Sequence, residues 1–205
     1  MKAEDLVLSV EGHPALGRPE AALTLIEFSD LQCGFCRRHA NSILPVLVER
    51  YVDTGRVRYV FFDFPIETRH PAAYGAAIAA RCAADQSLFQ PMRQRLLSSP
   101  GHLQPELLES HAAALGADAA EFSRCLGDSA TAEAVQQDLA LGQQLFVRGT
   151  PTFFVGLSRS RGAEVHLRRR LVGAQTLDVF EAALDSVLTE VTGSIAPHQP
   201  PVGHD

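Results

Sequence analysis

The sequence predicts an α/β fold that carries an inserted all-helical subdomain, and three observations support this prediction. A strand, a helix and a second strand follow one another within residues 20–66. Residues 67–146 are rich in alanine and leucine, and no part of them has the alternating pattern of a strand. Two strands and a closing helix then fill residues 147–192. The two α/β segments together therefore form one core, and the helical segment is inserted between them.

The first strand and helix are read from residues 22–51. Residues 22–28 are apolar and β-branched enough for a short buried strand, which ends at Ser29-Asp30. A helix follows, and its apolar residues recur at helical spacing. They are Ile43, Leu44, Leu47, Val48 and Tyr51. A second strand over residues 57–62 follows a turn at Gly55, and a strand–helix–strand unit of this length has parallel strands.

The helical block is divided by residues that interrupt helical periodicity, at 98–101, at Gly116 and at Gly127. We expect four or five helices between these breaks. They cover residues 71–85, 88–98, 105–115, 119–126 and 130–146.

Strand character returns in residues 151–155 and 164–172, and an amphipathic helix over residues 175–192 closes the fold. Residues 1–19 are expected to form an N-terminal extension, and residues 193–205, with their three prolines, a disordered tail.

Length, charge and composition exclude several classes of protein. The 205 residues are 46% hydrophobic, which is enough for a sizeable core. A net charge of −6 argues against binding to nucleic acid or to an anionic membrane surface. The basic run Arg168–Arg170 is interpreted as the outer face of an edge strand. No apolar stretch approaches the roughly 20 residues of a membrane span, so no membrane insertion is expected.

The compartment is not decided by the cysteines, because a reactive pair works in reducing and oxidising surroundings alike. The first ten residues contain Glu4 and Asp5 and no apolar run, so no signal peptide is visible. We expect a cytoplasmic protein as encoded, or a periplasmic or otherwise extracytoplasmic one if a leader has been removed.

Cys33-Gly34-Phe35-Cys36 places two thiols three positions apart at a strand-to-helix junction. Unpaired N–H groups and the helix dipole in the first turn stabilise a thiolate on Cys33. Cys33 is expected to be the nucleophile and Cys36 the thiol that resolves the mixed disulfide. A structural zinc site on these two cysteines and His39 lacks a fourth ligand at usable spacing, so no metal is expected.

The order of elements and several segments resemble the thioredoxin fold, and more closely the DsbA-like branch of thiol–disulfide oxidoreductases. The resemblance spans about residues 20–190. Its most specific part is the CxxC pair at a strand-to-helix junction combined with a distant Gly-Thr-Pro that opens a strand. The segments that carry it are Glu27–Cys36, Phe64-Pro65, His70–Ala73, Ala79–Ala83 with Gln86 and Phe89, Phe122–Leu126 and Val147–Phe153.

This resemblance implies an enzyme that exchanges its dithiol with protein or peptide thiols and disulfides, recycled by a further redox partner and needing no cofactor. We expect an oxidase first. A disulfide reductase, an isomerase or a non-catalytic polypeptide-binding protein are the alternatives. Gly34-Phe35 departs from the strongest oxidants of the family, which carry a histidine just before the second cysteine, and this leaves the direction of transfer open.

Gly34, Phe35, Thr150 and Pro151 are the predicted substrate-binding positions. Only about 5–6% of X–Pro bonds in folded proteins are cis, so the sequence alone favours a trans Pro151. The resemblance implies the opposite, a cis proline that lies against the CxxC pair. The backbone of Thr150 would then hydrogen-bond an extended substrate segment beside Cys33.

Glu27 is the predicted proton-transfer residue. Alternation along the first strand lets it point inward, and a buried carboxylate with a raised pKa could accept the proton that Cys36 must lose. A half-exposed strand carboxylate is the alternative. Asp30 is expected to cap a helix or turn, His39 to lie on the surface, and His70 to have no chemical role.

Cys82 and Cys125 fall in two different predicted helices. The alanines around Cys82 let another helix come within the Cα separation of about 4.4–6.8 Å that a disulfide requires. Some DsbA-like relatives bridge helices here, which makes a structural disulfide possible. Two buried cysteines that act as small hydrophobic residues are the alternative.

Overall fold

The computed structural model describes residues 6–193, and its centre is a six-stranded mixed sheet. The strand order is β1-β6-β5-β3-β4-β2. β3 and β4 are parallel neighbours, and β5, β6, β1 and β2 join antiparallel to their neighbours. The strands are β1 (Val7–Ser9), β2 (Ala15–Leu16), β3 (Leu23–Ser29), β4 (Val57–Asp63), β5 (Thr152–Arg159) and β6 (Glu164–Val172).

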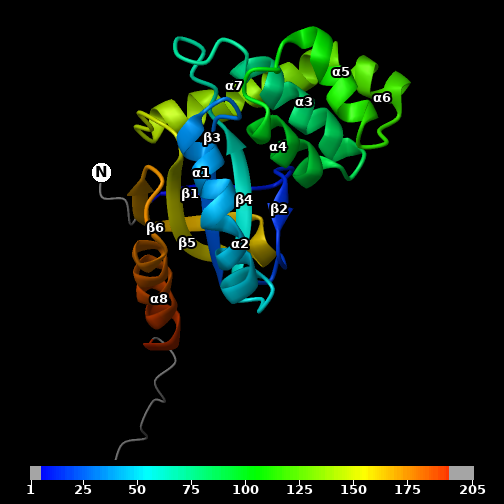
Figure 1. Ribbon diagram of the computed structural model, residues 1–205. Coiled ribbons are helices and arrows are strands. Elements are labelled where there is room, and N and C mark those ends of the chain that lie inside the picture. Colours follow the sequence, from blue (N-terminus) through cyan, green and yellow to red (C-terminus); the bar gives the residue numbers. More distant parts are fainter. Residues whose placement is uncertain (1–5, 194–205) are drawn as a thin grey trace, which may run out of the picture.

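Helices cover both faces of this sheet and extend beyond one of its ends (Figure 1). The helices of the core are α1 (Gly34–Ser42), α2 (Leu44–Leu47), the π-helical turn η2 (Val48–Val52), α7 (Ser129–Gln144), the 3₁₀ turn η3 (Ser160–Gly162) and α8 (Leu177–Gly193). The remaining four are α3 (Ala73–Asp85), α4 (Phe89–Ser98), α5 (Pro105–Ala113) and α6 (Ala119–Leu126).

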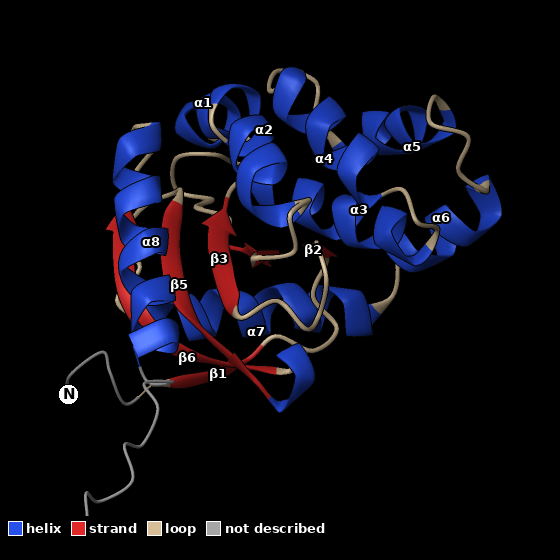
Figure 2. Ribbon diagram, turned by 90° about the horizontal axis from the view of Figure 1, so that it is seen from below, coloured by secondary structure: helices blue, strands red, loops and turns tan. Residues whose placement is uncertain are grey.

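The core has three layers. Figure 2 shows α1, α2 and α8 on one face of the strands and α7 on the other. Helices α3, α4, α5 and α6 gather beside the β4 end of the sheet, in the upper right of Figure 1. All seven residues of β3 are buried, because helices cover both faces of this central strand.

Alternation along β3 sends successive side chains to opposite layers. Leu25 belongs to the apolar cluster beneath α1, α2 and α8, whereas Ile26 and Phe28 belong to the cluster beneath α7. Glu27 therefore faces α1, the helix that carries the cysteine pair. On the opposite face α7 comes very close to the sheet at Gly142, where a Cβ atom would stand 2.5 Å from the Phe64 ring.

The strands and helices expected from the sequence are present with similar bounds, and the α/β class with a helical insertion is confirmed. The exceptions are α7, which falls inside the expected insertion of residues 67–146 but packs on the sheet of the core, and the N-terminal extension. Residues 7–9 and 15–16, which we had placed outside the core, form β1 and β2 and pair with β6 and β4. The expected tail lies outside the described residues, except for Gly193, which ends α8.

β6 is an edge strand along only half its length, and Arg168–Arg170 lie on that half, as expected from the sequence. β1 pairs with residues 164–166, and the arginines follow this pairing. Arg168 and Arg169 form ion pairs with Glu190 of α8. Arg170 donates a hydrogen bond to the Phe146 carbonyl oxygen. The basic run is therefore occupied with contacts inside the protein.

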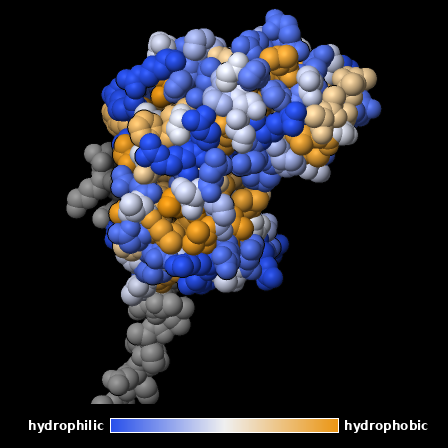
Figure 3. Space-filling model, in the orientation of Figure 1, coloured by the Kyte–Doolittle hydropathy of each residue, from blue (hydrophilic) through white to orange (hydrophobic). Residues whose placement is uncertain are grey.

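The surface seen in Figure 3 is mainly hydrophilic, with hydrophobic side chains in the lower part of the protein and others over the inserted helices at the upper right. Among the described residues, no helix is both long enough and apolar enough to cross a membrane.

Candidate active site around Cys33 and Cys36

The cysteine pair lies where β3 ends and α1 begins. Cys33 occupies the N-cap position of α1, and its carbonyl oxygen accepts a hydrogen bond from the Arg37 N–H. Both cysteines are unbridged. Cys33 is 5% exposed and Cys36 is fully buried, so an incoming sulfur atom can reach only Cys33.

Hydrogen bonds lower the pKa of the Cys33 thiol to about 5. The largest contribution comes from the Cys36 thiol, and it outweighs burial, which acts in the opposite direction. The Thr150 hydroxyl and the N–H groups of Phe35 and Cys36 add to it. At neutral pH Cys33 is therefore a thiolate, the form that attacks disulfides and leaves from them readily.

Cys36 has the opposite character. Burial, its hydrogen bond to Cys33 and the charge of Glu27 raise the pKa of its thiol well above the usual value. Its sulfur accepts a hydrogen bond from the Asp30 N–H, with N and Sγ 3.5 Å apart. The buried Ser29 hydroxyl has no hydrogen-bond partner among the described residues and lies close enough to Cys36 to stabilise its thiolate. The pair thus combines one thiolate with one protonated thiol.

A buried polar network lies beneath the pair. Glu27 is 0% exposed, and both its carboxylate oxygens accept hydrogen bonds from Arg93 of α4, at 3.0 and 2.9 Å. The Tyr59 hydroxyl on β4 donates a hydrogen bond of 2.7 Å to Glu27 Oε2. The Arg93 guanidinium also lies over the Phe61 ring, 4.6 Å from its centroid. The insertion therefore supplies the counter-ion of a carboxylate in the core.

The pKa of Glu27 differs from the sequence-based expectation. Burial alone would raise it, as expected, but the Arg93 charge and the hydrogen bond from Tyr59 outweigh burial and lower it. Glu27 is thus ionised near Cys36, and its lowered pKa makes it a weaker proton acceptor than expected. Its negative charge acts on Cys36 by keeping that thiol protonated.

The expectation that His39 lies on the surface is wrong. His39 is fully buried one turn after Cys36, and its Nε2 atom lies 2.9 Å from the Tyr59 hydroxyl. Burial lowers its pKa to about 4, so the imidazole is neutral. Its spacing of three residues from the buried Cys36 was the signal for this position, but the neighbouring arginines 37 and 38 suggested a solvated face.

The loop before β5 lies against the pair. The Thr150–Pro151 peptide bond is cis, as the resemblance implies. The Cys33 sulfur lies 3.4 Å from the Thr150 carbonyl oxygen, to which it donates a hydrogen bond when the thiol is protonated. The Thr150 N–H has no partner among the hydrogen bonds of the described residues, and it remains available to an incoming chain.

A groove of about 700 Å³ opens at Cys33 and brings together all the predicted substrate-binding positions. Phe35 is 54% exposed, and the Arg38 guanidinium lies over its ring. The groove is lined by residues of α1, of the loop before α3, of the Thr150 loop and of the turn after β6. They are Cys33, Gly34, Phe35, Arg37, Arg38, Asn41, Ile66, Arg69, His70, Gly149, Thr150, Pro151, Val172, Gly173 and Ala174.

Asp30 supports one wall of this groove. Its buried carboxylate accepts hydrogen bonds from the N–H groups of Gln32 and Ile66. Its Oδ2 atom also lies 2.8 Å from His70 Nδ1. The turn role expected of Asp30 therefore extends to holding a second loop, which no sequence pattern indicated.

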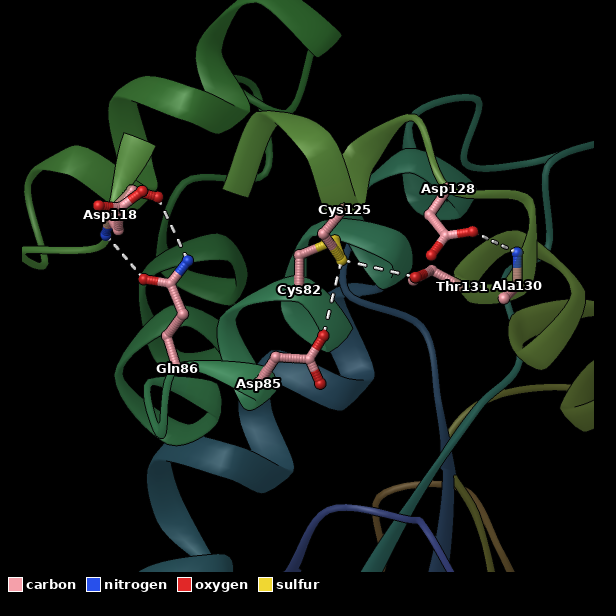
Figure 4. The surroundings of a disulfide bond; sticks show 8 residues. All are labelled: Cys82, Asp85, Gln86, Asp118, Cys125, Asp128, Ala130 and Thr131. Carbon is pink, nitrogen blue, oxygen red and sulfur yellow. Dashed lines mark hydrogen bonds between the residues drawn. A yellow bond between two sulfur atoms is a disulfide. The ribbon is translucent and has the colours of Figure 1, made fainter. Parts of the chain in front are cut away.

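Cys82 of α3 and Cys125 of α6 form a disulfide, with Cα atoms 5.6 Å apart (Figure 4). Three acidic residues and one basic residue line the adjoining pocket: Asp85, Glu121, Asp128 and Arg124. Asp85 Oδ2 lies 3.8 Å from Cys125 Sγ, and the Thr131 hydroxyl lies 3.5 Å from the same sulfur (Figure 4). This bridge belongs to the inserted helices and lies apart from the groove.

Arg93 and Tyr59 are site residues that the sequence analysis missed. Arg93 falls among Met92, Leu96 and Leu97, all of them buried, so the helical apolar pattern around it was the available signal. Within residues 6–193, no group of three or more His, Cys, Asp or Glu side chains could hold a metal ion.

Sequence relatives of this chain are longer proteins. The Na(+)/H(+) antiporter NhaA 3 of Salinispora tropica is 36% identical over 146 residues, which are 71% of this chain and 22% of that protein. The Na(+)/H(+) antiporter NhaA of Herminiimonas arsenicoxydans is 35% identical over 147 residues, 72% of this chain and 23% of the other. This chain thus spans about a fifth of the length of the curated relatives it matches.

Solved structures match nearly the whole chain. α-DsbA1 of Wolbachia pipientis has a TM-score of 0.76 at 22% identity and covers 92% of this chain and 97% of its own. A thioredoxin-like oxidoreductase from Silicibacter pomeroyi has a TM-score of 0.73 at 26% identity, with coverages of 87% and 94%. Oxidised BdbD from Bacillus subtilis has a TM-score of 0.70 at 21% identity, with coverages of 88% and 95%.

The fold of these structures agrees with the arrangement described above, in which a helical subdomain is inserted into a core that carries the CxxC pair. A family model described as Thioredoxin matches residues 9–166, which include both cysteine pairs and the cis proline. The chain therefore belongs to the thioredoxin family and has the DsbA-like form of its fold.

Proposed function

We propose that the protein is a thiol–disulfide oxidoreductase that oxidises cysteine pairs in polypeptide substrates. The observation that carries this proposal is the asymmetry of the CxxC pair. Cys33 is a stabilised thiolate at the mouth of a groove, and Cys36 is a buried protonated thiol directly behind it.

The reaction begins with the Cys33–Cys36 disulfide. A substrate thiolate attacks Cys33 Sγ, a bond forms between the two sulfurs, and the Cys33–Cys36 bond breaks. The Cys36 thiolate so released takes up a proton, because its pKa is high. A second substrate thiolate then attacks the substrate sulfur of the mixed disulfide, and Cys33 leaves as a thiolate. The substrate loses two electrons, and the protein dithiol holds them until an oxidant in the recycling partner accepts them.

The low pKa of Cys33 supports oxidation as the favoured direction. At pH 7 an ordinary thiol is ionised to a few per cent, whereas a thiol with a pKa of about 5 is almost fully ionised. Ionisation stabilises the reduced protein by about a hundredfold, which raises the reduction potential of a two-electron couple by about 60 mV. A disulfide with a stabilised reduced form passes its oxidising equivalents to the substrate.

The missing histidine changes the source of this stabilisation. In the position before the second cysteine stands Phe35, whose side chain has no donor, and the Cys33 thiolate depends instead on backbone N–H groups, the Cys36 thiol and the Thr150 hydroxyl. We therefore expect an oxidant that is weaker than family members with that histidine. If the reduction potential of the Cys33–Cys36 pair lies below that of the cellular glutathione pool, the alternative function, a disulfide reductase, would be favoured.

Oxidative refolding of a reduced, unfolded polypeptide tests this function. The parent protein is expected to accelerate disulfide formation, Cys33→Ser to have no activity, and Cys36→Ser to accumulate a mixed disulfide through Cys33. A Ser98→Ala variant on the surface of α4 serves as the control and keeps the parent rate. Activity of Cys33→Ser at the parent rate would refute the proposal.

We also propose that the protein works in an oxidising compartment. The Cys82–Cys125 disulfide supports this, because disulfides of this kind persist outside the reducing cytosol. Alkylation of the protein in intact cells, followed by mass spectrometry, checks the proposal. Free thiols at both positions in the cell would contradict it.

A further inference from the structure

The groove at Cys33 has a charge opposite to that of the whole protein. The formal net charge of the chain is −6, yet the residues that line the groove include Arg37, Arg38 and Arg69 and no aspartate or glutamate. Arg38 and Arg69 are exposed, and Arg37 is half-buried. Three cations therefore face one groove around the reactive sulfur.

These three arginines have no carboxylate partner among the described residues. The acidic residue directly behind the groove is Asp30, and its buried carboxylate is occupied by two backbone N–H groups and His70. Five arginines elsewhere do have a carboxylate partner, as Arg93 has in Glu27. The positive charge of the groove is thus not compensated from within the protein.

The other groups of the groove suit an extended peptide. Phe35 and Val172 are each 54% exposed and offer apolar contacts on two sides of Cys33. The unpartnered Thr150 N–H can pair with the backbone of a chain that lies beside Pro151. A peptide that uses this N–H places the side chains next to its cysteine within reach of the arginines.

We infer that the groove selects polypeptide substrates whose reactive cysteine is flanked by aspartate or glutamate. The inference rests on the proposed function and adds the chemical class of its substrate. Carboxylates beside the cysteine pair with Arg37, Arg38 and Arg69, and this attraction raises the rate at which substrate and enzyme associate. The sulfur chemistry is unchanged, because the arginines do not take part in the exchange.

Three dithiol peptides that differ only in the residues beside their cysteines, Glu, Gln or Lys, test this inference. The oxidised protein is mixed with each peptide at low ionic strength, quenched with acid, alkylated and analysed by mass spectrometry, since the chain has no tryptophan to follow by fluorescence. The Glu peptide is expected to react about tenfold faster than the Lys peptide. The difference should shrink at 1 M salt, where the Debye length is about 3 Å.

Two triple variants with the same change of charge separate the groove from the net charge. R37Q/R38Q/R69Q is expected to lose the preference, and R124Q/R159Q/R161Q, which removes three arginines outside the groove, to keep it. Equal rates for the three peptides with the parent protein would overturn the inference and leave the proposed function intact. Failure to oxidise any of the peptides would instead count against the proposed function.

The last substrate in this experiment is reduced glutathione, which is itself anionic. If R37Q/R38Q/R69Q slows its reaction while the Glu and Gln peptides react equally fast, the arginines serve a small anionic thiol, and the inference about polypeptides is overturned. Retention of the Glu preference in that triple variant would do the same, because the charges would then lie elsewhere.

Discussion

The two cysteine pairs of this protein have the same chemistry and opposite surroundings. Cys33 lies at a helix N-terminus, with hydrogen-bond donors to its sulfur and arginines around the groove. The Cys82–Cys125 pair lies between two inserted helices, with Asp85 3.8 Å from one sulfur. A thiolate is stabilised at the first pair and repelled at the second. The reactivity of a cysteine is therefore decided by the charges and donors that the fold places beside it.

The two cysteine pairs should differ most in their effect on the stability of the protein. The Cys82–Cys125 disulfide joins residues 43 positions apart, so Cys82→Ala with Cys125→Ala is expected to lower the free energy of unfolding by up to about 4 kcal/mol. Urea unfolding measures this, with Ser98→Ala/Ser123→Ala at exposed positions of α4 and α6 as the control. Reduction of Cys33–Cys36 should instead stabilise the protein at pH 7, because the Cys33 thiolate is more stable in the folded state. Equal effects of the two pairs on stability would break the comparison.

The second largest difference is expected in how readily glutathione reduces the two disulfides. We expect the Cys33–Cys36 disulfide to be reduced at least about a hundredfold more readily at equilibrium, a difference of about 60 mV or more. Alkylation at a series of glutathione ratios, with mass mapping of each cysteine, gives both equilibria in one sample. Joint reduction of both pairs at the same potential would contradict this expectation.

The pH dependence of alkylation isolates the thiolate itself. With Cys33 and Cys36 reduced, the rate at Cys33 should rise through pH 5 and level off by about pH 6.5, since its pKa is about 5. At pH 6 it should exceed the rate of the same thiol in urea by about tenfold, because the larger thiolate fraction outweighs the lower nucleophilicity. A midpoint near pH 8.5 in the folded protein would show that the fold does not stabilise this thiolate.

The smallest expected effect concerns the acidic surroundings of the second pair. Asp85→Asn removes a negative charge beside Cys125 and should let an anionic thiolate approach more easily, so that dithiothreitol reduces the bridge about threefold faster. Glu133→Gln makes the same change of charge on α7, away from the pocket, and should leave the rate unaltered. No difference between these variants would mean that burial alone protects the bridge.

The sequence predicted the fold and the reactive pair because their signals are local. Strand and helix periods, the break at Gly116 and the spacing of Cys33 and Cys36 are readable within short windows. β1 and β2 were missed because strands of three and two residues have no period to detect. They are held by neighbours far along the chain, at residues 164–166 and 59–60.

The network beneath the pair was less predictable. Inward alternation suggested that Glu27 is buried, but the direction of its pKa depends on Arg93, 66 residues away on an inserted helix. The position of His39 also depends on a long-range contact, because its partner Tyr59 is on β4. Local pattern indicates that a polar residue is buried, and only tertiary contact determines its charge.

The bond between Arg93 and Glu27 limits how this protein can be shortened. A designer who replaced α3 to α6 with a tight turn, in order to obtain a minimal redox domain, would leave a buried carboxylate without its guanidinium. An unpaired buried charge of this kind costs about 3–5 kcal/mol, a large part of the stability of a small domain. The trimmed chain would therefore need Glu27→Leu or Glu27→Gln in the same step. In this family member a change to the inserted helices therefore requires a matching substitution in the core.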